Sequence, residues 1–421
     1  MKKLLTAALA ALFITVTVGE SAEAYEDTGG FAVEAERALP AKTPYDKSYV
    51  EILWNTSEAE TAGAPIADGE FVLLPVRNTV RKLNRKDGSI AAAAELDELI
   101  SEDHSGAVAG DVLVQPTETS IYAVDLNGME VICSRQFGDI ATDVAIIDKL
   151  VYFGVKSENA YKFVCADIGK GLETVWEYVS DSPITSPALF GEYVVFGAGE
   201  ALAVCRFDSG RCVENPVGAE ITNVFAGQYA VFMTCADGSL RKLRLEDSGQ
   251  TEEDTLTILD IGGVLTAPAE FNNRVYVGST EGFYVLDGLN MEILKAYPEM
   301  KNASAPIVCY GNGQRAYTVA PHLDSGRDIW YLYGILDTEA GQTASEIAKI
   351  IDYTNGRLAV SDSGVMYFRD ADGQLWALAV KETNYFVVVI KIILTLAIVV
   401  MVVVTISALA KKRNSNKPPR Y

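Results

Sequence analysis

The chain has 421 residues, and with 35 basic and 57 acidic residues its formal net charge at neutral pH is −22. A chain this acidic argues against nucleic acid and anionic lipid headgroups as partners, because both are held largely by positive charge. Six cysteines without a Cys-x-x-Cys motif and only two histidines argue against a zinc site.

The first 24 residues have the pattern of a secretory signal peptide. Lysines at positions 2 and 3 precede an apolar run over residues 4–18, and Ala-Glu-Ala at 22–24 fits the small-x-small rule for cleavage. The alternative, a membrane span, is weaker because the run is too short to cross ~30 Å of hydrocarbon comfortably. We expect residues 1–24 to be removed and residues 25–47 to form an extended lead-in.

Between residues 48 and 384, short β-rich runs alternate with Gly, Asp and Asn turns, and one unit recurs about every 40 residues. The clearest copy, residues 265–297, reads as four strands joined by tight turns that contain Gly and Asn. The other copies begin near residues 63, 105, 142, 185, 222, 304 and 355. The repeat therefore predicts eight units of four antiparallel strands.

In most units an acid or Asn followed by Gly marks the turn between the third and fourth strands. Asp can accept hydrogen bonds from the backbone that follows it, and Gly readily adopts the left-handed conformation. Such pairs recur in phase with the repeat, which indicates a structural origin. Examples are Asn84 with Gly88, Asp125 with Gly128, Asp167 with Gly171, and Asp337 with Gly341.

The eighth unit stops after its third strand, while a strand without a unit of its own, residues 48–55, precedes the first unit. It carries Trp54, as the outer strand of the third unit carries Trp176. We infer that residues 48–55 complete the last unit and close a ring, which removes the exposed edges of the sheets. The predicted fold is all-β, an eight-bladed β-propeller of four-stranded antiparallel blades over residues 48–384, plus one C-terminal transmembrane α-helix.

At this point the repeats resemble the PQQ-like, or quinoprotein-type, β-propeller repeat. The resemblance rests on Ala-Pro before the first strand, on VYVGSTEGFYVLD at 275–287, and on the Asp-to-Gly turn. Eight blades also resemble the BamB-type propellers, exported lipoproteins that act as scaffolds in membrane protein assembly. This chain departs from that pattern because it has no lipobox cysteine and carries its anchor at the C-terminus. The resemblance therefore implies a fold and a scaffolding style of function.

Quinoprotein dehydrogenases share this fold. For them the resemblance implies PQQ stacked at the propeller centre, a bound calcium ion, a catalytic Asp and often a disulfide between adjacent cysteines. The present sequence has no Cys-Cys pair. Neither the calcium ligands nor the catalytic Asp can be assigned to a position in this chain, so we expect no cofactor and no metal site and keep PQQ with calcium as the alternative.

The C-terminal segment predicts a membrane span over residues 385–410. Residues 392–410 contain no charge and, at 1.5 Å per residue, reach about 28 Å as a helix, enough for a bilayer core. A buried helix of a soluble protein is the alternative. The residues expected at the two membrane interfaces are Tyr385, Lys391, Lys411, Lys412 and Arg413. The short basic tail, residues 411–421, places the C-terminus in the cytoplasm and the N-terminal ectodomain outside the cell membrane.

The sequence contains no GxSxG, HExxH, Walker or GxGxxG element. We therefore assign no catalytic residue. Cys205 and Cys212 lie in the two arms of an expected hairpin and form the best candidate disulfide. The seventh unit has a longer second hairpin, where His322, Asp324 and Arg327 are candidate binding residues, because insertions in repeat proteins often project on the binding face. An ordinary long hairpin is the alternative.

The sequence thus predicts a non-catalytic, membrane-anchored, extracytoplasmic scaffold that binds a protein partner or an envelope polymer, and no nucleic acid. Two alternatives stay open. The first is a PQQ-dependent oxidoreductase. The second is a ligand sensor that works through a membrane partner, since its own cytoplasmic tail is too short to form a signalling domain.

Overall fold

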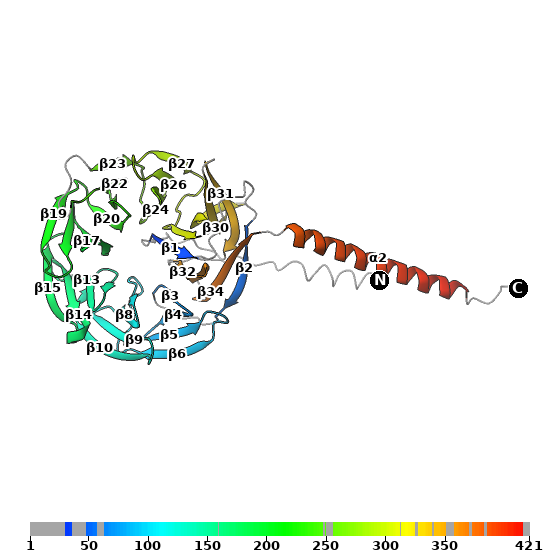
Figure 1. Cartoon of the computed structure of the whole chain (residues 1–421), viewed down its shortest axis with the longest axis horizontal. Coiled ribbons are helices and arrows are strands. Elements are labelled where there is room, and N and C mark those ends of the chain that lie inside the picture. Colours follow the sequence, from blue (N-terminus) through cyan, green and yellow to red (C-terminus); the bar gives the residue numbers. More distant parts are fainter. Residues whose placement is uncertain are drawn as a thin grey trace.

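The computed structural model shows a ring of sheets with one long helix leading away from it (Figure 1). It describes residues 30–35, 48–56, 63–158, 160–246, 249, 256–311, 313–324, 327–338, 341–350, 358–369, 373–382 and 385–415. Within these residues eight separate sheets follow one another around the ring in chain order. The predicted eight-bladed propeller is therefore confirmed.

Each of the first four blades has four main strands, which follow one another from the axis outward. Blade 1 has β3 (Ile66–Asp68), β4 (Phe71–Val76), β5 (Thr79–Asn84) and β6 (Ile90–Glu95). Blade 2 has β7 (Ala107–Ala109), β8 (Val112–Pro116), β9 (Ser120–Asp125) and β10 (Glu130–Gln136). Blade 3 has β12 (Ala145–Ile147), β13 (Leu150–Lys156), β14 (Tyr161–Asp167) and β15 (Glu173–Ser180), with β11 (Asp139–Ile140) also on β13 and η1 (Ile168–Lys170) in a turn. Blade 4 has β16 (Ala188–Phe190), β17 (Tyr193–Ala198), β18 (Ala201–Arg206) and β19 (Cys212–Pro216).

The last four blades complete the ring. Blade 5 has β20 (Ile221–Ala226), β21 (Val231–Cys235), β22 (Ser239–Leu243) and β23 (Thr257–Asp260). Blade 6 has β24 (Ala269–Phe271), β25 (Arg274–Ser279), β26 (Gly282–Asp287) and β27 (Ile293–Tyr297). Blade 7 has β28 (Ile307–Gly311), β29 (Gln314–Asp324), β30 (Arg327–Thr338) and β31 (Gly341–Ile350). Blade 8 has β32 (Ala359–Val360), β33 (Val365–Arg369), β34 (Leu375–Glu382) and, from the other end of the chain, β2 (Ser48–Asn55).

The antiparallel order sorts the turns onto two faces of the ring. One face carries the first and third turns of every blade. We call it the exit face, because β34, the last propeller strand, ends on that side. The other, the connection face, carries the second turns and the blade-to-blade connections.

The ring closes where β2 pairs antiparallel with β34, from Ser48 opposite Glu382 to Asn55 opposite Trp376. This is the position predicted for residues 48–55 from the sequence. In every blade except the eighth, the four main strands are consecutive in the chain. The eighth blade takes its outer strand, β2, from the segment before blade 1, and this pairing joins the last blade to the first.

The core lies between neighbouring blades. The middle strands are buried on both faces, as in β17, where all six residues are buried. A strand covered on both sides needs a continuous apolar run, which explains sequences such as YVVFGA. Outer strands such as β15 alternate between exposed and half-buried residues, because only one of their faces is covered.

A hydroxyl clasp recurs at the start of the blades on the connection face. The threonine hydroxyl oxygen accepts a hydrogen bond from a glycine N–H of the second strand. The pairs and N–O distances are Thr142 with Gly154 at 2.7 Å, Thr185 with Gly197 at 2.9 Å and Thr266 with Gly278 at 3.1 Å. The clasp gives the glycine N–H a hydrogen-bond acceptor, because the innermost strand is too short to pair with the second strand at this glycine.

A tryptophan clamp joins two pairs of blades. The Trp54 indole N–H donates to the Arg85 carbonyl at 2.7 Å, and the Trp176 indole N–H donates to the Phe207 carbonyl at 3.2 Å. In each case the ring lies on the third turn of the next blade. β2 and β15 resemble each other in sequence because each carries a tryptophan that makes the same contact with the next blade.

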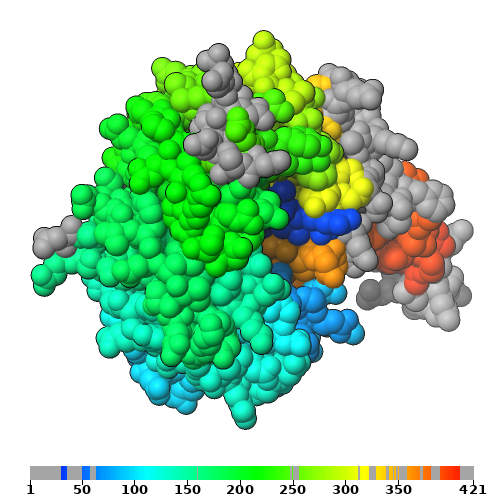
Figure 2. Space-filling model, turned by 60° about the vertical axis from the view of Figure 1, so that its left-hand side comes forward, coloured from blue at the N-terminus to red at the C-terminus, as the bar shows by residue number. Residues whose placement is uncertain are grey.

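Residues 31–35 of the lead-in form a strand inside the ring. This strand, β1 (Phe31–Ala35), pairs in parallel with β28, the innermost strand of blade 7. Figure 1 shows β1 among the inner strands, and Figure 2 shows its blue atoms in a hollow beside yellow β28 and orange blade 8. Apolar side chains of β1, Phe31 and Val33 among them, pack against the core between blades 7 and 8, which explains why this short run leaves solvent.

The chain after blade 8 forms one helix, α2 (Tyr385–Ser415). Its segment Val389–Ser407 is long and apolar enough to cross a membrane. Ile392 and most of the large apolar side chains that follow are exposed to the surroundings of the protein. Of the predicted interface residues, Tyr385 begins the helix, Lys391 lies in its second turn, and Lys411, Lys412 and Arg413 belong to its last turns.

Candidate functional site

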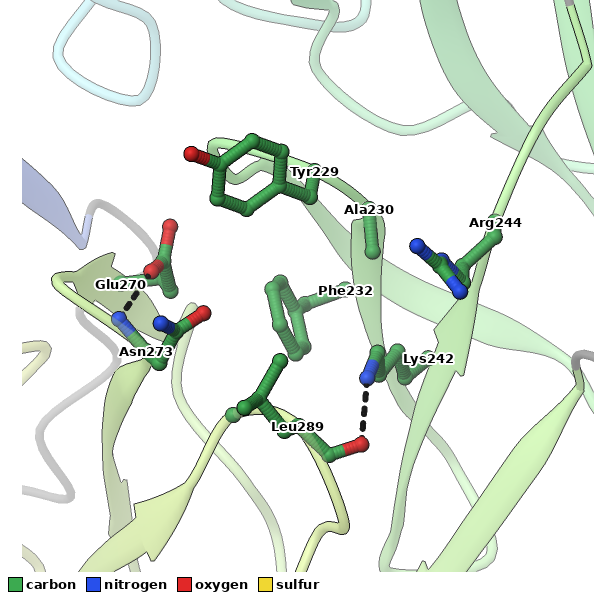
Figure 3. A pocket seen from close by; sticks show the side chains of 9 residues that line it. Tyr229, Ala230, Phe232, Lys242, Arg244, Glu270, Asn273 and Leu289 are labelled. Atoms are coloured by element: carbon green, nitrogen blue, oxygen red, sulfur yellow. Dashed lines mark hydrogen bonds between the residues drawn. The ribbon is translucent and has the colours of Figure 1, made fainter.

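A cavity of about 320 Å³ lies between blades 5 and 6, near the exit face (Figure 3). Blade 5 contributes residues from its first turn and its two middle strands, and blade 6 contributes its innermost strand and its first and third turns. The lining residues are Tyr229, Ala230, Phe232, Lys242, Arg244, Glu270, Asn273, Gly288 and Leu289. We call this cavity the 5/6 groove.

The 5/6 groove has an apolar floor and an apolar rim. Phe232 is almost fully buried and forms the floor, whereas Tyr229 and Leu289 stand at the rim with 59 % and 63 % of their surface exposed. Large apolar side chains exposed to this extent on both sides of a cavity mark a surface that another molecule can cover. The two rim residues come from different blades, so the groove exists only where blades 5 and 6 pack together.

Lys242 is the buried cation of the groove. It lies directly opposite Phe232 in the strand register and is only 8 % exposed. Its ammonium donates a hydrogen bond to the Leu289 carbonyl across the blade junction at 2.7 Å. Burial lowers the pKa of Lys242 below its ordinary value, and the neighbouring Arg244 lowers it further, although Asp287 and Glu270 act in the opposite direction.

Glu270 holds the first turns of the two blades together. One carboxylate oxygen accepts the Asn273 N–H at 2.9 Å, and the other accepts the Gln228 N–H at 2.8 Å. A carboxylate that accepts two backbone donors is fixed in place. Glu270 therefore acts on the groove mainly by fixing its wall, and it is a poor candidate for a catalytic base.

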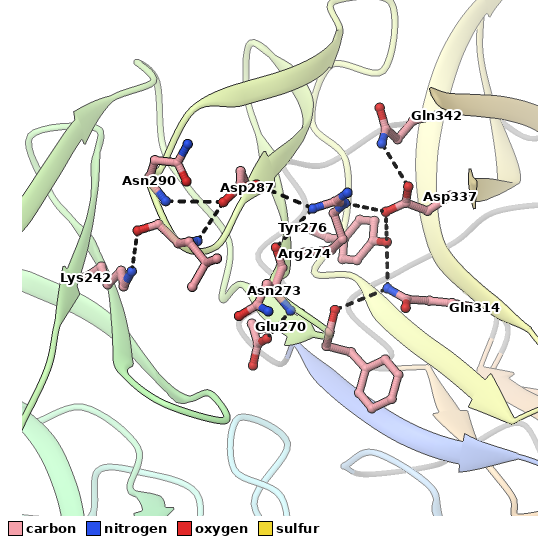
Figure 4. Close-up of polar contacts among 12 residues, drawn as sticks. Lys242, Glu270, Asn273, Arg274, Tyr276, Asp287, Asn290, Gln314, Asp337 and Gln342 are labelled. Carbon is pink, nitrogen blue, oxygen red and sulfur yellow. Dashed lines mark hydrogen bonds and ion pairs between the residues drawn. The ribbon is translucent and has the colours of Figure 1, made fainter. Parts of the chain in front are cut away.

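The Leu289 side of the groove is fixed from blade 7 (Figure 4). The Asp287 carboxylate accepts the Leu289 N–H at 2.8 Å and lies 3.6 Å from the Arg274 guanidinium. Arg274 also forms an ion pair of 3.2 Å with Asp337 of blade 7. This chain of contacts preorganises the turn that carries Leu289.

Asp337 is itself surrounded by donors. It accepts the Tyr276 hydroxyl at 2.9 Å and the Gln342 amide at 2.8 Å, and the Gln314 amide donates to the Tyr276 oxygen at 3.0 Å. Burial, followed by the neighbouring Asp337 charge, raises the pKa of Tyr276 well above its ordinary value. Tyr276 is therefore a permanent hydrogen-bond donor of a structural network.

A second cavity, of about 510 Å³, lies on the connection face, between the second turn of blade 1 and the segment that leads to blade 2. It is wider and more polar, and its wall includes Glu98. The Glu98 carboxylate accepts the hydroxyls of Thr117 at 2.6 Å and Ser120 at 2.7 Å. These bonds hold the connection between the blades, so we regard this cavity as structural.

The predicted site residues lie away from the 5/6 groove. His322, Asp324 and Arg327 lie at the tip of the β29–β30 hairpin on the connection face, with Asp324 opposite Arg327 in the register. β29 and β30 have 11 and 12 residues, which makes them the longest strands described. The structure does not describe these three side chains, so their binding role stays a prediction.

Cys205 and Cys212 are joined by a disulfide between β18 and β19, where they are directly opposite each other. The described free cysteines are Cys133, Cys165, Cys235 and Cys309. Three of these are buried, and burial raises the pKa of Cys235 to about 11 and that of Cys309 to about 12, so they remain inert thiols at neutral pH.

Sequence reasoning did not find the 5/6 groove. Its residues are spread over two repeats, and none belongs to a motif. A signal does exist: the third strands of units 1 and 5 both carry a lysine, Lys82 and Lys242, but the position before the second strand of unit 5 holds Ala230 where unit 1 has Phe71. The correspondence between Ala230 and Phe71 becomes visible only when the pairing of the second and third strands is known for both blades.

The resemblance to quinoproteins places a quinone and its calcium ion at the axis of the ring. β1 takes up the part of the channel beside blades 6 and 7, within the space where the resemblance places PQQ. In the described part of the chain, His, Cys, Asp and Glu form no group of three that could hold a metal ion. We therefore derive no chemistry from either group.

By its fold the chain is a PQQ-like, BamB-like eight-bladed propeller. No protein-family model matches the chain, and no curated protein matches it in sequence.

Many solved structures match this fold, and two of them serve as examples. BamB from Moraxella catarrhalis superposes with a TM-score of 0.60 and 15 % identity, over 78 % of this chain and 99 % of that one. A europium-containing methanol dehydrogenase superposes with a TM-score of 0.56 and 11 % identity, over 80 % of this chain and 86 % of that one. At these identities the likeness concerns the fold alone.

Proposed function

We propose that this chain is a membrane-anchored, extracytoplasmic β-propeller that binds other proteins and catalyses no reaction. The observation that carries the proposal is the 5/6 groove, with exposed apolar residues at its rim and walls that are fixed by hydrogen bonds from three blades. A rigid groove of this kind suits recognition, because binding costs little conformational entropy.

The two ends of the chain support a membrane arrangement. We propose that residues 1–24 direct export, that α2 spans the cell membrane, and that the basic tail stays in the cytoplasm. The partner is a protein or an envelope polymer on the outer side. This agrees with the scaffold role that the resemblance to BamB-type propellers implies.

The second candidate is a quinoprotein-type oxidoreductase, since a methanol dehydrogenase shares the fold. Two observations argue against it. β1 lies inside the ring, where a quinone would bind, and the Glu270 carboxylate already accepts hydrogen bonds from two backbone N–H groups. To separate the two, the full-length chain in lipid nanodiscs would be titrated with PQQ and Ca²⁺. We expect no quinone absorbance on the protein and no rise in the unfolding temperature, whereas saturable binding with both changes would favour the oxidoreductase.

The scaffold proposal has its own test. Lysine-reactive cross-linking of intact cells that carry the full chain, followed by mass spectrometry, should yield the same few extracytoplasmic or membrane proteins in repeated experiments. A chain without α2 should lose the membrane-integral ones among them. If only random, abundance-ranked proteins were captured, the scaffold function would have to be abandoned.

A further inference from the structure

The repeat gives an internal comparison for the 5/6 groove. Lys82 of blade 1 and Lys242 of blade 5 occupy the same place in the third strand. Lys82 donates to the Leu126 carbonyl in the third turn of blade 2 at 2.7 Å, just as Lys242 donates to the Leu289 carbonyl in the third turn of blade 6. Both lysines therefore cross a blade junction in the same way.

In blade 1 the space beside this lysine is filled by the chain itself. The Lys82 ammonium lies 4.1 Å from the centre of the Phe71 ring. At this distance the ring face attracts the cation, and the two groups form a cation–π pair. Phe71 lies diagonally across the strand pair, since Leu73 is opposite Lys82 and Asn84 is opposite Phe71.

In blade 5 no aromatic ring occupies the position that corresponds to Phe71. Phe232 is opposite Lys242 as Leu73 is opposite Lys82, so the position of Phe71 falls to Ala230, one residue before β21. Ala230 lines the 5/6 groove beside Lys242. Part of the cavity thus corresponds to the space that the Phe71 ring takes in blade 1.

We infer that the 5/6 groove receives an aromatic side chain of a partner protein, which lies beside Lys242 as the Phe71 ring lies beside Lys82. This inference rests on the proposed function and specifies the partner's chemistry at that site. Phe232 and Leu289 supply apolar walls for the ring, and exposed Tyr229 can close over it.

The charge of the ectodomain restricts the partner further. Residues 25–384 carry a net charge of about −28. An acidic segment would be repelled as it approaches, so the aromatic residue should lie in a segment that is neutral or basic. The partner class is therefore a protein segment with an exposed Phe, Tyr or Trp among neutral or basic residues.

The inference can be tested with small probes on the full-length chain in nanodiscs. N-acetyl-phenylalaninamide serves as the aromatic probe and N-acetyl-leucinamide as the apolar control, both followed by saturation-transfer NMR against empty nanodiscs. A ligand of about 15 heavy atoms at about 0.3 kcal/mol per atom binds in the millimolar range. We expect saturable binding of the aromatic probe that is clearly stronger than that of the leucine analogue.

Two variants locate the site. Ala230→Phe rebuilds the blade 1 arrangement and should abolish binding of the aromatic probe while the unfolding temperature stays close to that of the parent. Lys242→Met removes the cation together with its hydrogen bond to the Leu289 carbonyl, and it should weaken binding about 3- to 30-fold. Lys82→Met is the matched control, because its neighbouring space is already filled, and it should leave binding unchanged.

A gain of function gives the sharpest outcome. Phe71→Ala should open an equivalent space beside Lys82 and add a second binding site. Absence of aromatic binding, equal binding of the leucine analogue, or full binding by a folded Ala230→Phe chain would each overturn the inference. Capture of partners by lysine-reactive cross-linking does not depend on this groove, so failure of the aromatic probe together with specific capture would leave the scaffold function standing.

Discussion

Single residues at the blade junctions show how a weak repeat specifies a closed ring. Trp54 and Trp176 lie on the third turns of the following blades, and a side chain at Gly88 or Gly210 would collide with them. The resemblance of the two tryptophan strands could be predicted from the sequence, because it is a local pattern. The space left by Ala230 could not, since it depends on which residues of two different strands share a register.

The tryptophan clamp makes a prediction for Gly210. In the alanine variant the new Cβ would lie 2.4 Å from the Trp176 ring, at a backbone φ of +63°. Gly191, in the same blade, has a φ of +58° and no atom within 4 Å, so Gly191→Ala reports the backbone strain alone. We expect Gly210→Ala to lower the free energy of unfolding by about 1–3 kcal/mol more than Gly191→Ala in urea titrations. Equal losses would show that the clamp does not require a glycine at this position.

Lys242 makes a prediction about pH. Its pKa is lowered by burial and by Arg244, against the opposing effects of Asp287 and Glu270. The ammonium therefore loses its proton at a lower pH than an ordinary lysine, whose pKa is 10.5. Binding of the aromatic probe should weaken as the pH rises, with a midpoint below 10.5, and Lys242→Met should show no such step. An unchanged affinity across this range in the parent chain would contradict a cation beside the ring.

At the scale of elements, most strands could be predicted because each blade repeats the same order of apolar run and turn. For residues 265–297 the structure has β24 to β27 within about two residues of the expected limits. β1 could not be predicted as a strand of blade 7, since five residues without turn signals say nothing about a partner almost 280 positions away. β1 pairs with β28 because β28 has a free edge, and this edge is formed only when the ring folds.

The β18–β19 hairpin gives a prediction on the disulfide. Cys205 and Cys212 are seven positions apart, and closing a loop of this size in the unfolded chain is worth about 2–3 kcal/mol in the loop-entropy model. The Cys205→Ser/Cys212→Ser chain should lose about this much stability in urea. The parent chain should lose a similar amount when it is reduced, and the variant should not respond to reductant. A parent chain that ignores the reductant while remaining accessible to it would contradict the pairing.

β1 gives a prediction on the channel. A side chain at Gly30 would lie 2.4 Å from the Pro268 carbonyl, too close to fit without a shift of the backbone. Gly30→Val should therefore detach β1 and speed hydrogen exchange at residues 31–35. The ring is closed by β2 and β34, so the unfolding temperature should change little. Unchanged exchange at 31–35 would show that β1 is not held where the structure places it.

At the scale of the whole molecule, the chain passes along the axis before it closes the ring. Gly30 lies beside the connection to β24, and β1 runs parallel to β28, so it leads from the connection face to the exit face. β2 then starts, and β34 ends, on the exit side, where Ser48 is opposite Glu382. The 5/6 groove lies near this same face, so a partner in the groove would approach from the side on which the chain leads to α2.

Position-resolved photo-cross-linking in intact cells tests the central claim, that this propeller is a protein-binding scaffold, most directly. A photoreactive amino acid would replace Tyr229 at the groove rim and, as a control, Ile258 on the outer strand of the same blade, which is exposed to a similar extent. We expect one discrete protein adduct at position 229 that disappears when Ala230→Phe is added, and none of that mass at position 258. Absence of any defined protein adduct at position 229, and likewise at positions spread over both faces and the rim, would contradict a protein-binding role.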